Sequence, residues 1–417
     1  MRLRYLRIDT PSVTRANPFT FGGKVSTLQR VDELFSTTPG TPIPDSLSGV
    51  QVAPDASMPN VPIGRLRLWD SDVGWNAVEP LRDQFRWERL DDLIHNAASR
   101  GIKVDYVLGP TPPWAGERST DPPRNVKDLT DFVRILVARY KGKLNSIAVW
   151  NEPNLRTYFT GTPEELAAIT QSVFTTVKSI DSTVQVLAPS TTIRANGSLF
   201  SFYTRYLRSL GKLGWPINAF SVHSYPDSAG GPSDRSASLQ LFRQILNLEH
   251  APDLPLLDTE INYGLGGSNS PRRVIQDQEA ADYIAQTYLE SIRLGIAATD
   301  WYLWTKSNYD LLGIQLNPTS EPAIESWRWT HGLVVGAQFV GCLPSGVSWL
   351  CSFTRGSHTF GILYSSTVKG SDVQIPAPWN EACPESGACA KLESRTLHSG
   401  MTPVLLQASD SPTSSGR

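Results

Sequence analysis

The sequence predicts an α/β protein, a (β/α)8 TIM barrel followed by a small antiparallel β-sandwich-like domain. From residue 19 to residue 304, short apolar runs that suit buried strands alternate with longer segments whose apolar residues recur at helical spacing. After residue 335 the sequence consists of short runs in which apolar and polar residues alternate, separated by Gly, Ser and Pro turns. This pattern is typical of antiparallel strands. Right-handed βαβ units repeated in this way close into a barrel at eight strands.

The expected barrel elements follow one another in a regular order. Strands are expected at 19–25, 64–70, 103–108, 144–150, 184–188, 219–223, 254–258 and 298–304. Helices are expected at 87–100, 129–140, 163–177, 199–210, 239–248, 279–294 and 327–335. An open, doubly wound sheet is the alternative, but the sequence has no Gly-rich phosphate loop of the kind such folds carry.

Two domains are predicted, a (β/α)8 barrel over 1–335 and a small β domain with a frayed tail over 336–417. Residues 36–62 are rich in Pro, Gly, Ser and Thr, and we expect a long excursion at the barrel mouth, either a functional loop or a tolerated insertion. Residues 1–10 show no secretory signal and are expected to form a first strand or an unstructured arm. Strands of the β domain are expected at 347–354, 359–364, 372–375, 390–394 and 403–406.

Composition narrows the classes of partner. The formal net charge of the 417 residues is −2 and charged residues make up 19%, so no global electrostatic attraction to nucleic acid or an anionic membrane is expected. No run approaches the ~20 apolar residues of a membrane span. The 12 Trp, 13 Tyr and 14 Phe serve core packing first, although flat aromatic faces also stack on sugar rings. The sequence does not indicate an oligomeric state.

All four cysteines lie in the last fifth of the chain. The simplest of three connectivities pairs Cys342 with Cys351 and Cys383 with Cys389. A zinc site is the rival interpretation, but the spacing lacks a CxxC. Disulfides are therefore favoured, and they predict a secreted or extracytoplasmic location.

A polar cluster ends the apolar run of the expected fourth strand. Trp150-Asn151-Glu152-Pro153-Asn154 places Glu152 at the carboxyl end of a strand, because Pro153 has no N–H with which to continue a ladder. In a parallel barrel that end carries the chemistry. The alternative interpretation is an Asn-Glu pair that only caps a helix.

A second glutamate, Glu260, ends the expected seventh strand, so both carboxylates are expected to project into the same barrel mouth. Hydrolysis of a glycosidic bond needs two such carboxyl groups, one protonated to release the leaving oxygen and one ionised. At a separation of about 5 Å the ionised group attacks carbon and the stereochemistry is retained.

These motifs resemble clan A of the glycoside hydrolases, the "4/7" retaining barrels, and most of all family 39 and its bacterial cellulase-like relatives. The resemblance covers residues 17–406 and is carried by the following sequences: Trp150-Asn151-Glu152-Pro153-Asn154, Asp258-Thr259-Glu260, Arg67-Leu68-Trp69-Asp70, His223-Ser224-Tyr225-Pro226 and Trp301-Tyr302-Leu303-Trp304. It implies a retaining glycosidase in which Glu152 is the acid/base and Glu260 the nucleophile.

The resemblance also assigns supporting roles. Asn151 would bind the hydroxyl next to the anomeric carbon, and Arg67 would keep the nucleophile ionised. The remaining candidates for substrate binding or orientation are His223, Tyr225, Asp70, a sugar platform at Trp304 and a further subsite at Trp114. His223 could equally be a satisfied barrel histidine. Trp69 could also line a further subsite, but core packing is favoured for both Trp69 and Trp301.

Two other functions remain open on the sequence. One is a carbohydrate-binding barrel protein without catalysis, and the other is a transglycosylase that uses the same covalent intermediate. No cofactor or metal is implied. Serine esterase and metalloprotease functions fit poorly, because neither a GxSxG elbow nor an HExxH helix is present. The sugar, the linkage and the choice between endo and exo action are not fixed by the sequence.

Overall fold

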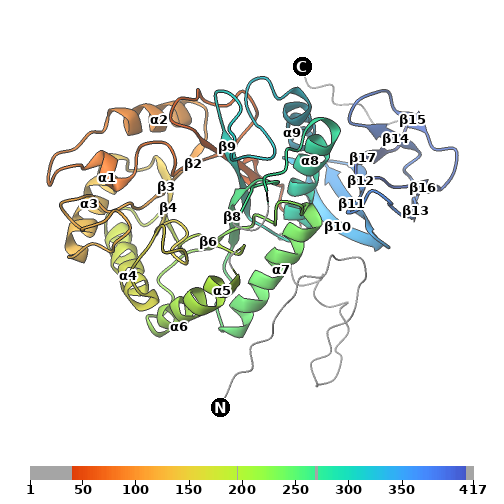
Figure 1. Cartoon of the computed structure of the whole chain (residues 1–417). Coiled ribbons are helices and arrows are strands. Elements are labelled where there is room, and N and C mark those ends of the chain that lie inside the picture. Colours follow the sequence, from red (N-terminus) through yellow and green to blue (C-terminus); the bar gives the residue numbers. More distant parts are fainter. Residues whose placement is uncertain (1–39, 195, 268–270, 410–417) are drawn as a thin grey trace, which may run out of the picture. The chain divides into compact units, whose positions relative to one another are not determined.

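The computed structural model describes residues 40–194, 196–267 and 271–409. Parallel strands of this part of the chain lie in the spatial order β5-β4-β3-β2-β1-β9-β8-β7-β6, with helices arranged around them (Figure 1). Strands β5 and β6 are two halves of one barrel position. The bridge between Leu187 and Ala219 joins this position to β7, and the N–H of Ala188 donates to the carbonyl of Ala219 at 2.9 Å. The sheet therefore closes, and the predicted (β/α)8 barrel is confirmed.

The barrel strands are mostly short and buried. They are β1 (Ser48–Val52), β2 (Arg65–Leu68), β3 (Lys103–Val107), β4 (Leu144–Ala148), β5 (Gln185–Leu187), β6 (Thr191–Thr192), β7 (Phe220–His223), β8 (Leu256–Ile261) and β9 (Ala298–Trp304). The helices are α1 (Trp75–Val78), α2 (Glu88–Ser99), α3 (Val126–Arg139), α4 (Pro163–Ile180), α5 (Asn196–Ser198), α6 (Thr204–Lys212), α7 (Pro232–Leu248), α8 (Asp277–Arg293) and α9 (Glu321–Val334).

The first barrel strand is not where the sequence predicts it. The expected strand at 19–25 lies outside the described residues, and β1 lies inside 36–62, the stretch expected to be an excursion at the mouth. All five residues of β1 are buried between β2 and β9. Gly49 is needed there, because a Cβ at this position would meet the Asp300 Oδ1 atom at 1.9 Å. The strand is short and carries Gly and Gln, so its apolar pattern is hidden among the turn-forming residues around it.

The expected helices are present because their local signals agree with their packing. The hydroxyl of Thr162 accepts a bond from the N–H of Glu165 at 3.1 Å, and the Glu165 carboxylate accepts from the N–H of Thr162 at 2.7 Å. This reciprocal capping box, followed by Pro163 at the first helical position, starts α4 at the predicted residue. In the described residues no helix lies between β1 and β2, so the first strand passes directly to the second.

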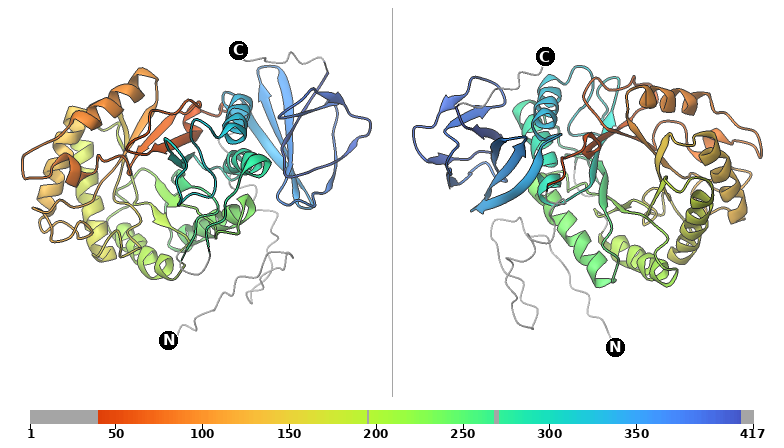
Figure 2. Two further views of the ribbon diagram at one scale, coloured as in Figure 1. Left: turned by 45° about the horizontal axis from the view of Figure 1, so that its top comes forward. Right: turned by 180° about the vertical axis from the view of Figure 1, so that it is seen from behind.

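The C-terminal part of the described chain is antiparallel, as predicted. One sheet has the strand order β10-β11-β12-β17-β14-β15, and β13 pairs with β16 (Figure 2). The strands are β10 (Gln338–Ser345), β11 (Ser348–Arg355), β12 (His358–Ser365), β13 (Asp372–Gln374), β14 (Glu381–Pro384), β15 (Ala390–Lys391), β16 (Thr396–His398) and β17 (Val404–Gln407). Strands β10, β14 and β16 were not predicted, and the strand predicted at 390–394 ends at Lys391.

Two disulfides join Cys342 to Cys351 and Cys383 to Cys389, the simplest of the pairings considered. The first links residues that face each other across β10 and β11. Barrel helix α8 contacts this sheet directly, because the Tyr364 hydroxyl donates to Glu290 at 2.6 Å. None of the helices in the described residues has the length and apolar character needed to cross a membrane.

Candidate active site

The backbone turns sharply where β4 ends. Trp150 and Glu152 have φ angles of 79° and 40°, in the left-handed region that residues with a side chain rarely adopt. The turn is held by its surroundings, since Trp150 is 1% exposed and its indole N–H donates to the carbonyl of Tyr158 at 2.8 Å. Asn154 adds a second tie, with its amide donating to the Thr192 carbonyl at 3.0 Å. This exit leads Glu152 toward the barrel mouth.

Strand β8 reaches the same mouth through an irregularity in its pairing. The register of β8 against β9 shifts between Asp258 and Ile261. Asp258 lies on the helix side of the sheet, where its Oδ2 is 2.7 Å from Arg235 of α7. Two residues later, Glu260 points instead into the mouth, where it lines a cavity. The register shift therefore separates Asp258, which pairs with Arg235, from Glu260, which lines the cavity.

The two glutamates predicted to form a pair do come together. Oxygens of Glu152 and Glu260 lie within 4.8 Å of each other, and their residues are 8% and 5% exposed. Arg67 lies beneath them, fully buried. Its Nη1 donates to Glu260 Oε1 at 2.6 Å and its Nη2 donates to Asn151 Oδ1 at 2.7 Å. One guanidinium thus positions both the second carboxylate and the asparagine beside the first.

His223 and Tyr225 complete the hydrogen-bond network around the pair. The Tyr225 hydroxyl donates to Glu260 Oε2 at 2.8 Å. The Nδ1 atom of His223 lies 3.0 Å from Glu152 Oε1 and 3.3 Å from Glu260 Oε2, so it can bond either carboxylate. Its other ring nitrogen is buried, with no partner among the described residues. The interpretation of His223 as a merely satisfied barrel histidine is therefore not favoured.

Electrostatics distinguish the members of this network. Burial raises the pKa of Glu152 to about 7, although a hydrogen bond from Thr192 and the charges of Arg67 and Arg194 act in the opposite direction. Burial lowers the pKa of His223 to about 3, so the imidazole is neutral near pH 7 and its contacts with the carboxylates are hydrogen bonds. A neutral Glu152 near pH 7 is able to donate a proton.

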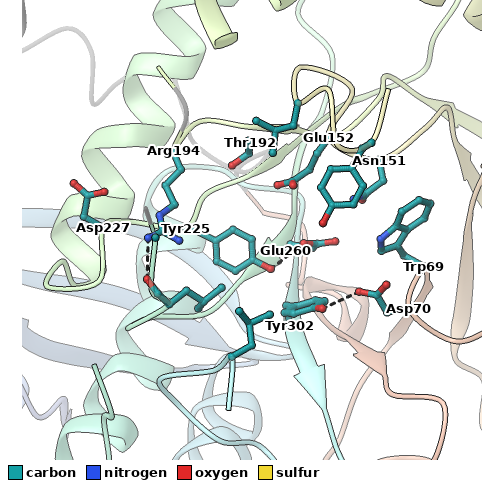
Figure 3. A pocket seen from close by; sticks show the side chains of 15 residues that line it. Trp69, Asp70, Asn151, Glu152, Thr192, Arg194, Tyr225, Asp227, Glu260 and Tyr302 are labelled. Atoms are coloured by element: carbon teal, nitrogen blue, oxygen red, sulfur yellow. Dashed lines mark hydrogen bonds between the residues drawn. The ribbon is translucent and has the colours of Figure 1, made fainter. Parts of the chain in front are cut away.

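Figure 3 shows the cavity over the pair, which has a volume of about 460 Å³. Three of the predicted site residues, besides the two glutamates, line this cavity, and a fourth contacts one of the glutamates. Asn151, Asp70 and Tyr225 line the cavity directly, and Arg67 acts from below through Glu260.

The two tryptophans predicted to form sugar subsites, Trp304 and Trp114, do not line the cavity. Trp304 is 1% exposed in the hydrophobic core, and Trp114 packs edge-on against Trp75 with its indole N–H on the Glu79 carbonyl; neither lines the cavity. The register of β1 against β9 shifts between residues 50 and 52, which turns Trp304 away from the mouth. Trp301 is buried in the core, as predicted.

The aromatic side chains that do line the cavity include Trp69, Tyr158 and Tyr302. Trp69 was expected in the core, and its half-exposed ring instead lies edge-on to Tyr158 with centroids 6.2 Å apart. The Tyr302 hydroxyl donates to Asp70 Oδ2 at 2.8 Å. Burial raises the pKa of Asp70, and this bond works against that rise.

Sequence reasoning missed Tyr302, Tyr158, Thr192 and Arg194. Tyr302 lies in the motif of the eighth strand, two residues before Trp304, and regular strand alternation places both on the same face. The register shift of β9 against β1 breaks that alternation. Arg194 follows the fifth strand, and its guanidinium donates to the Leu265 carbonyl at 2.8 Å, which ties two mouth loops together. No sequence signal marked this contact, because it depends on how the loops fold.

Glu152, His223 and Glu260 each offer an atom that could bind a metal ion, and these atoms lie within 4.8 Å of one another. The same atoms are already joined by hydrogen bonds, and Arg67 supplies positive charge next to Glu260. Arg67 and His223 therefore partner the two glutamate side chains without a metal ion.

We compared the sequence and the fold of this chain with those of known proteins. No protein-family model matches the chain. A curated β-xylosidase of Caldicellulosiruptor saccharolyticus is 29% identical over 205 residues, a match that covers 44% of this chain and 39% of that protein.

Solved structures share the fold over most of the chain. A family 39 glycoside hydrolase from Bacteroides cellulosilyticus WH2 has a TM-score of 0.67 at 18% identity, covering 88% of this chain and 81% of that one. The chain has the fold of that enzyme. A family 44 endoglucanase from Clostridium thermocellum gives a TM-score of 0.58 at 12% identity, with 89% and 99% of the two chains covered. A family 51 arabinofuranosidase from Xanthomonas axonopodis pv. citri gives 0.56 at 11%, with 89% and 97% covered. The predicted resemblance to family 39 is therefore confirmed for the fold.

Proposed function

We propose that the protein is a retaining glycoside hydrolase that cleaves O-glycosidic bonds of an oligo- or polysaccharide by double displacement. The observation that carries this proposal is the pair of buried glutamates at the ends of the fourth and seventh barrel strands, with oxygens within 4.8 Å of each other. A spacing of about 5 Å suits direct attack by one carboxylate, whereas an inverting enzyme needs roughly 6.5–9.5 Å for an intervening water.

The first step forms a bond between Glu260 and the anomeric carbon while the bond to the leaving oxygen breaks. Arg67 and Tyr225 hold Glu260 through both of its oxygens, which orients it for attack. Glu152 gives its proton to the leaving oxygen, which a pKa of about 7 permits near neutral pH.

The second step returns both groups to their starting states. Once Glu260 is esterified its negative charge is gone, so Glu152 loses its proton more readily and is ready to act as a base. Glu152 takes a proton from water, the hydroxide attacks the anomeric carbon, and the bond to Glu260 breaks. Two inversions leave the original anomeric configuration.

The lining of the cavity supports a neutral sugar as substrate. Four carboxylates face it, and Arg194 is the one arginine or lysine among the described lining residues. A polyuronide would meet like charges there. The amide nitrogen of Asn151 is left to donate to the hydroxyl beside the anomeric carbon, because its oxygen accepts from Arg67. The two disulfides support a secreted or extracytoplasmic location.

The test is hydrolysis over a broad panel of defined glycosides and polysaccharides by the wild type and by Glu260→Gln. We expect the variant to lose turnover of every substrate that the wild type cleaves. Full activity in the variant would refute the role of Glu260. Binding of glycans without any hydrolysis by the wild type would instead indicate a carbohydrate-binding barrel.

A further inference from the structure

A second, larger cavity lies beside the one that holds the glutamate pair. Its volume is about 750 Å³, against about 460 Å³ for the first. The two cavities share five lining residues, Trp69, Asp70, Tyr158, Tyr302 and Leu311. They therefore form one continuous depression. Neither Glu152 nor Glu260 lines the second cavity, so its role is not the bond-breaking step itself.

The proposed mechanism fixes which end of the substrate the second cavity receives. Glu152 must stand beside the glycosidic oxygen to protonate it, so the leaving group lies on the Glu152 side, where Thr192 and Arg194 line the wall. Asp70 and Tyr302 lie on the other side of Glu260 from Glu152 (Figure 3). Both residues also line the second cavity, and Glu152 does not. The second cavity therefore adjoins the sugar that becomes attached to the enzyme, the glycone.

The walls of the second cavity have the chemistry of a sugar site. Tyr158 and Tyr309 line this cavity and are 36% and 44% exposed, so their rings are accessible to a ligand there. Asn76, Asn308 and Lys306 add hydrogen-bonding groups to the lining. Aromatic faces with a few polar groups suit the alternating apolar and hydroxyl surfaces of a sugar. The volume lies within the roughly 300–1,000 Å³ of pockets that hold drug-sized ligands, which a disaccharide matches.

We propose that the second cavity binds further sugar units of the glycone, so that the enzyme releases oligosaccharides of two or more sugars and not single sugars. The proposal rests on the proposed glycosidase function. An enzyme that removes one terminal sugar needs a wall directly behind that sugar. Here the space continues past Asp70 and Tyr302, and it is bordered by the segments at 53–55 and 305–309.

The experiment compares matched pairs of 4-nitrophenyl glycosides that carry one sugar or two of the same kind, such as xyloside and xylobioside, or glucoside and cellobioside. We expect kcat/KM for the cleaved bioside to exceed that for its monoside by about tenfold or more, the effect of one well-formed contact region. Chromatography of the products from a longer oligosaccharide should show the disaccharide or a longer sugar as the smallest glycone product.

Tyr309→Ala tests the cavity itself. The loop backbone stays anchored in this variant, because the Tyr309 N–H and carbonyl both bond the Gln315 side chain, at 2.9 and 3.0 Å. We expect the ratio of bioside to monoside kcat/KM to fall about tenfold. Phe200→Ala is the matched control, since Phe200 is 42% exposed and lines neither cavity. It should leave the ratio unchanged.

The outcomes separate the two proposals. Single sugars as the first products, or equal kcat/KM values for monosides and biosides, would overturn the inference while Glu260-dependent hydrolysis upholds the glycosidase function. A ratio that falls equally in Tyr309→Ala and Phe200→Ala would also overturn it. No turnover of any monoside, bioside or polysaccharide would overturn the proposed function itself.

Discussion

Glu152 should set the alkaline limb of the pH–rate profile. Burial raises its pKa from an ordinary 4.5 to about 7, which corresponds to about 3 kcal/mol of preference for the neutral acid. Only the protonated form can donate to the leaving oxygen. With a substrate whose leaving group needs protonation, kcat/KM should therefore be level just below pH 7, as long as Glu260 stays ionised, and fall about tenfold per pH unit above pH 7.

The perturbation is Glu152→Ala, assayed from pH 4 to pH 10 with two aryl glycosides of the same sugar. The variant should lose roughly 10²–10⁴ in kcat/KM with a poor leaving group. With 2,4-dinitrophenolate, which leaves without a proton, the loss should be small and the limb near pH 7 should disappear.

A matched control is available in the β domain. Burial also raises the pKa of Glu385 to about 7, and this residue lines neither cavity. Glu385→Gln should therefore leave the alkaline limb in place. A limb near pH 7 that persists in Glu152→Ala, or one that vanishes in Glu385→Gln, would refute the assignment of the proton donor.

The same shift in Glu152 makes a prediction for stability. Between pH 4.5 and about 7, Glu152 is protonated in the native state but ionised in the unfolded chain. Its stabilising contribution to the free energy of unfolding is therefore complete below pH 4.5. It declines by up to about 3 kcal/mol as the pH rises through 7. Denaturant titrations of the wild type and Glu152→Gln at pH 5 and pH 8 should differ in this sense, and an equal pH dependence of both proteins would contradict it.

Two further predictions concern residues around and beyond the pair. The variant Arg67→Met leaves Glu260 buried without its charged partner, so its free energy of unfolding should fall by about 3–5 kcal/mol and its kcat should also fall. A denaturant midpoint like that of the wild type would contradict this prediction. The Cys342–Cys351 disulfide closes the β10–β11 hairpin, and neither cysteine lines either cavity. The double variant Cys342→Ser and Cys351→Ala should therefore lose roughly 2–3 kcal/mol of stability and keep its kcat/KM. A loss of activity in the folded double variant would contradict this prediction.

Periodicity was sufficient to predict seven of the eight barrel strands and the positions of both glutamates. Short apolar runs, 147–150 before Glu152 and 256–257 before Glu260, mark these strands, because strands of a parallel barrel are covered on both faces. The first strand, at Ser48–Val52, was lost for the opposite reason. It is five residues long, contains Gly49 for contact with Asp300, and is flanked by turn-forming residues that dominate any window around it.

The polar part of the site was predictable and its aromatic part was not. Arg67, Asn151 and Tyr225 lie next to motifs that end strands, and strand ends meet at one rim of a barrel. The choice between Tyr302 and Trp304 depends on a register shift in β9, where the simple alternation of strand faces fails. Pairing irregularities are set by neighbouring strands, so one strand's sequence does not reveal them.

The most direct test of the two-carboxylate mechanism is to trap its covalent intermediate. A 2-deoxy-2-fluoro glycoside of the cleaved sugar, with an activated leaving group, should form the intermediate faster than water can remove it. Mass spectrometry of the digested protein should then find one fluorosugar on the peptide that contains Glu260, and NMR of products from an ordinary substrate should show retained anomeric configuration. A label on Glu152 or another residue, or an inverted product, would contradict the account.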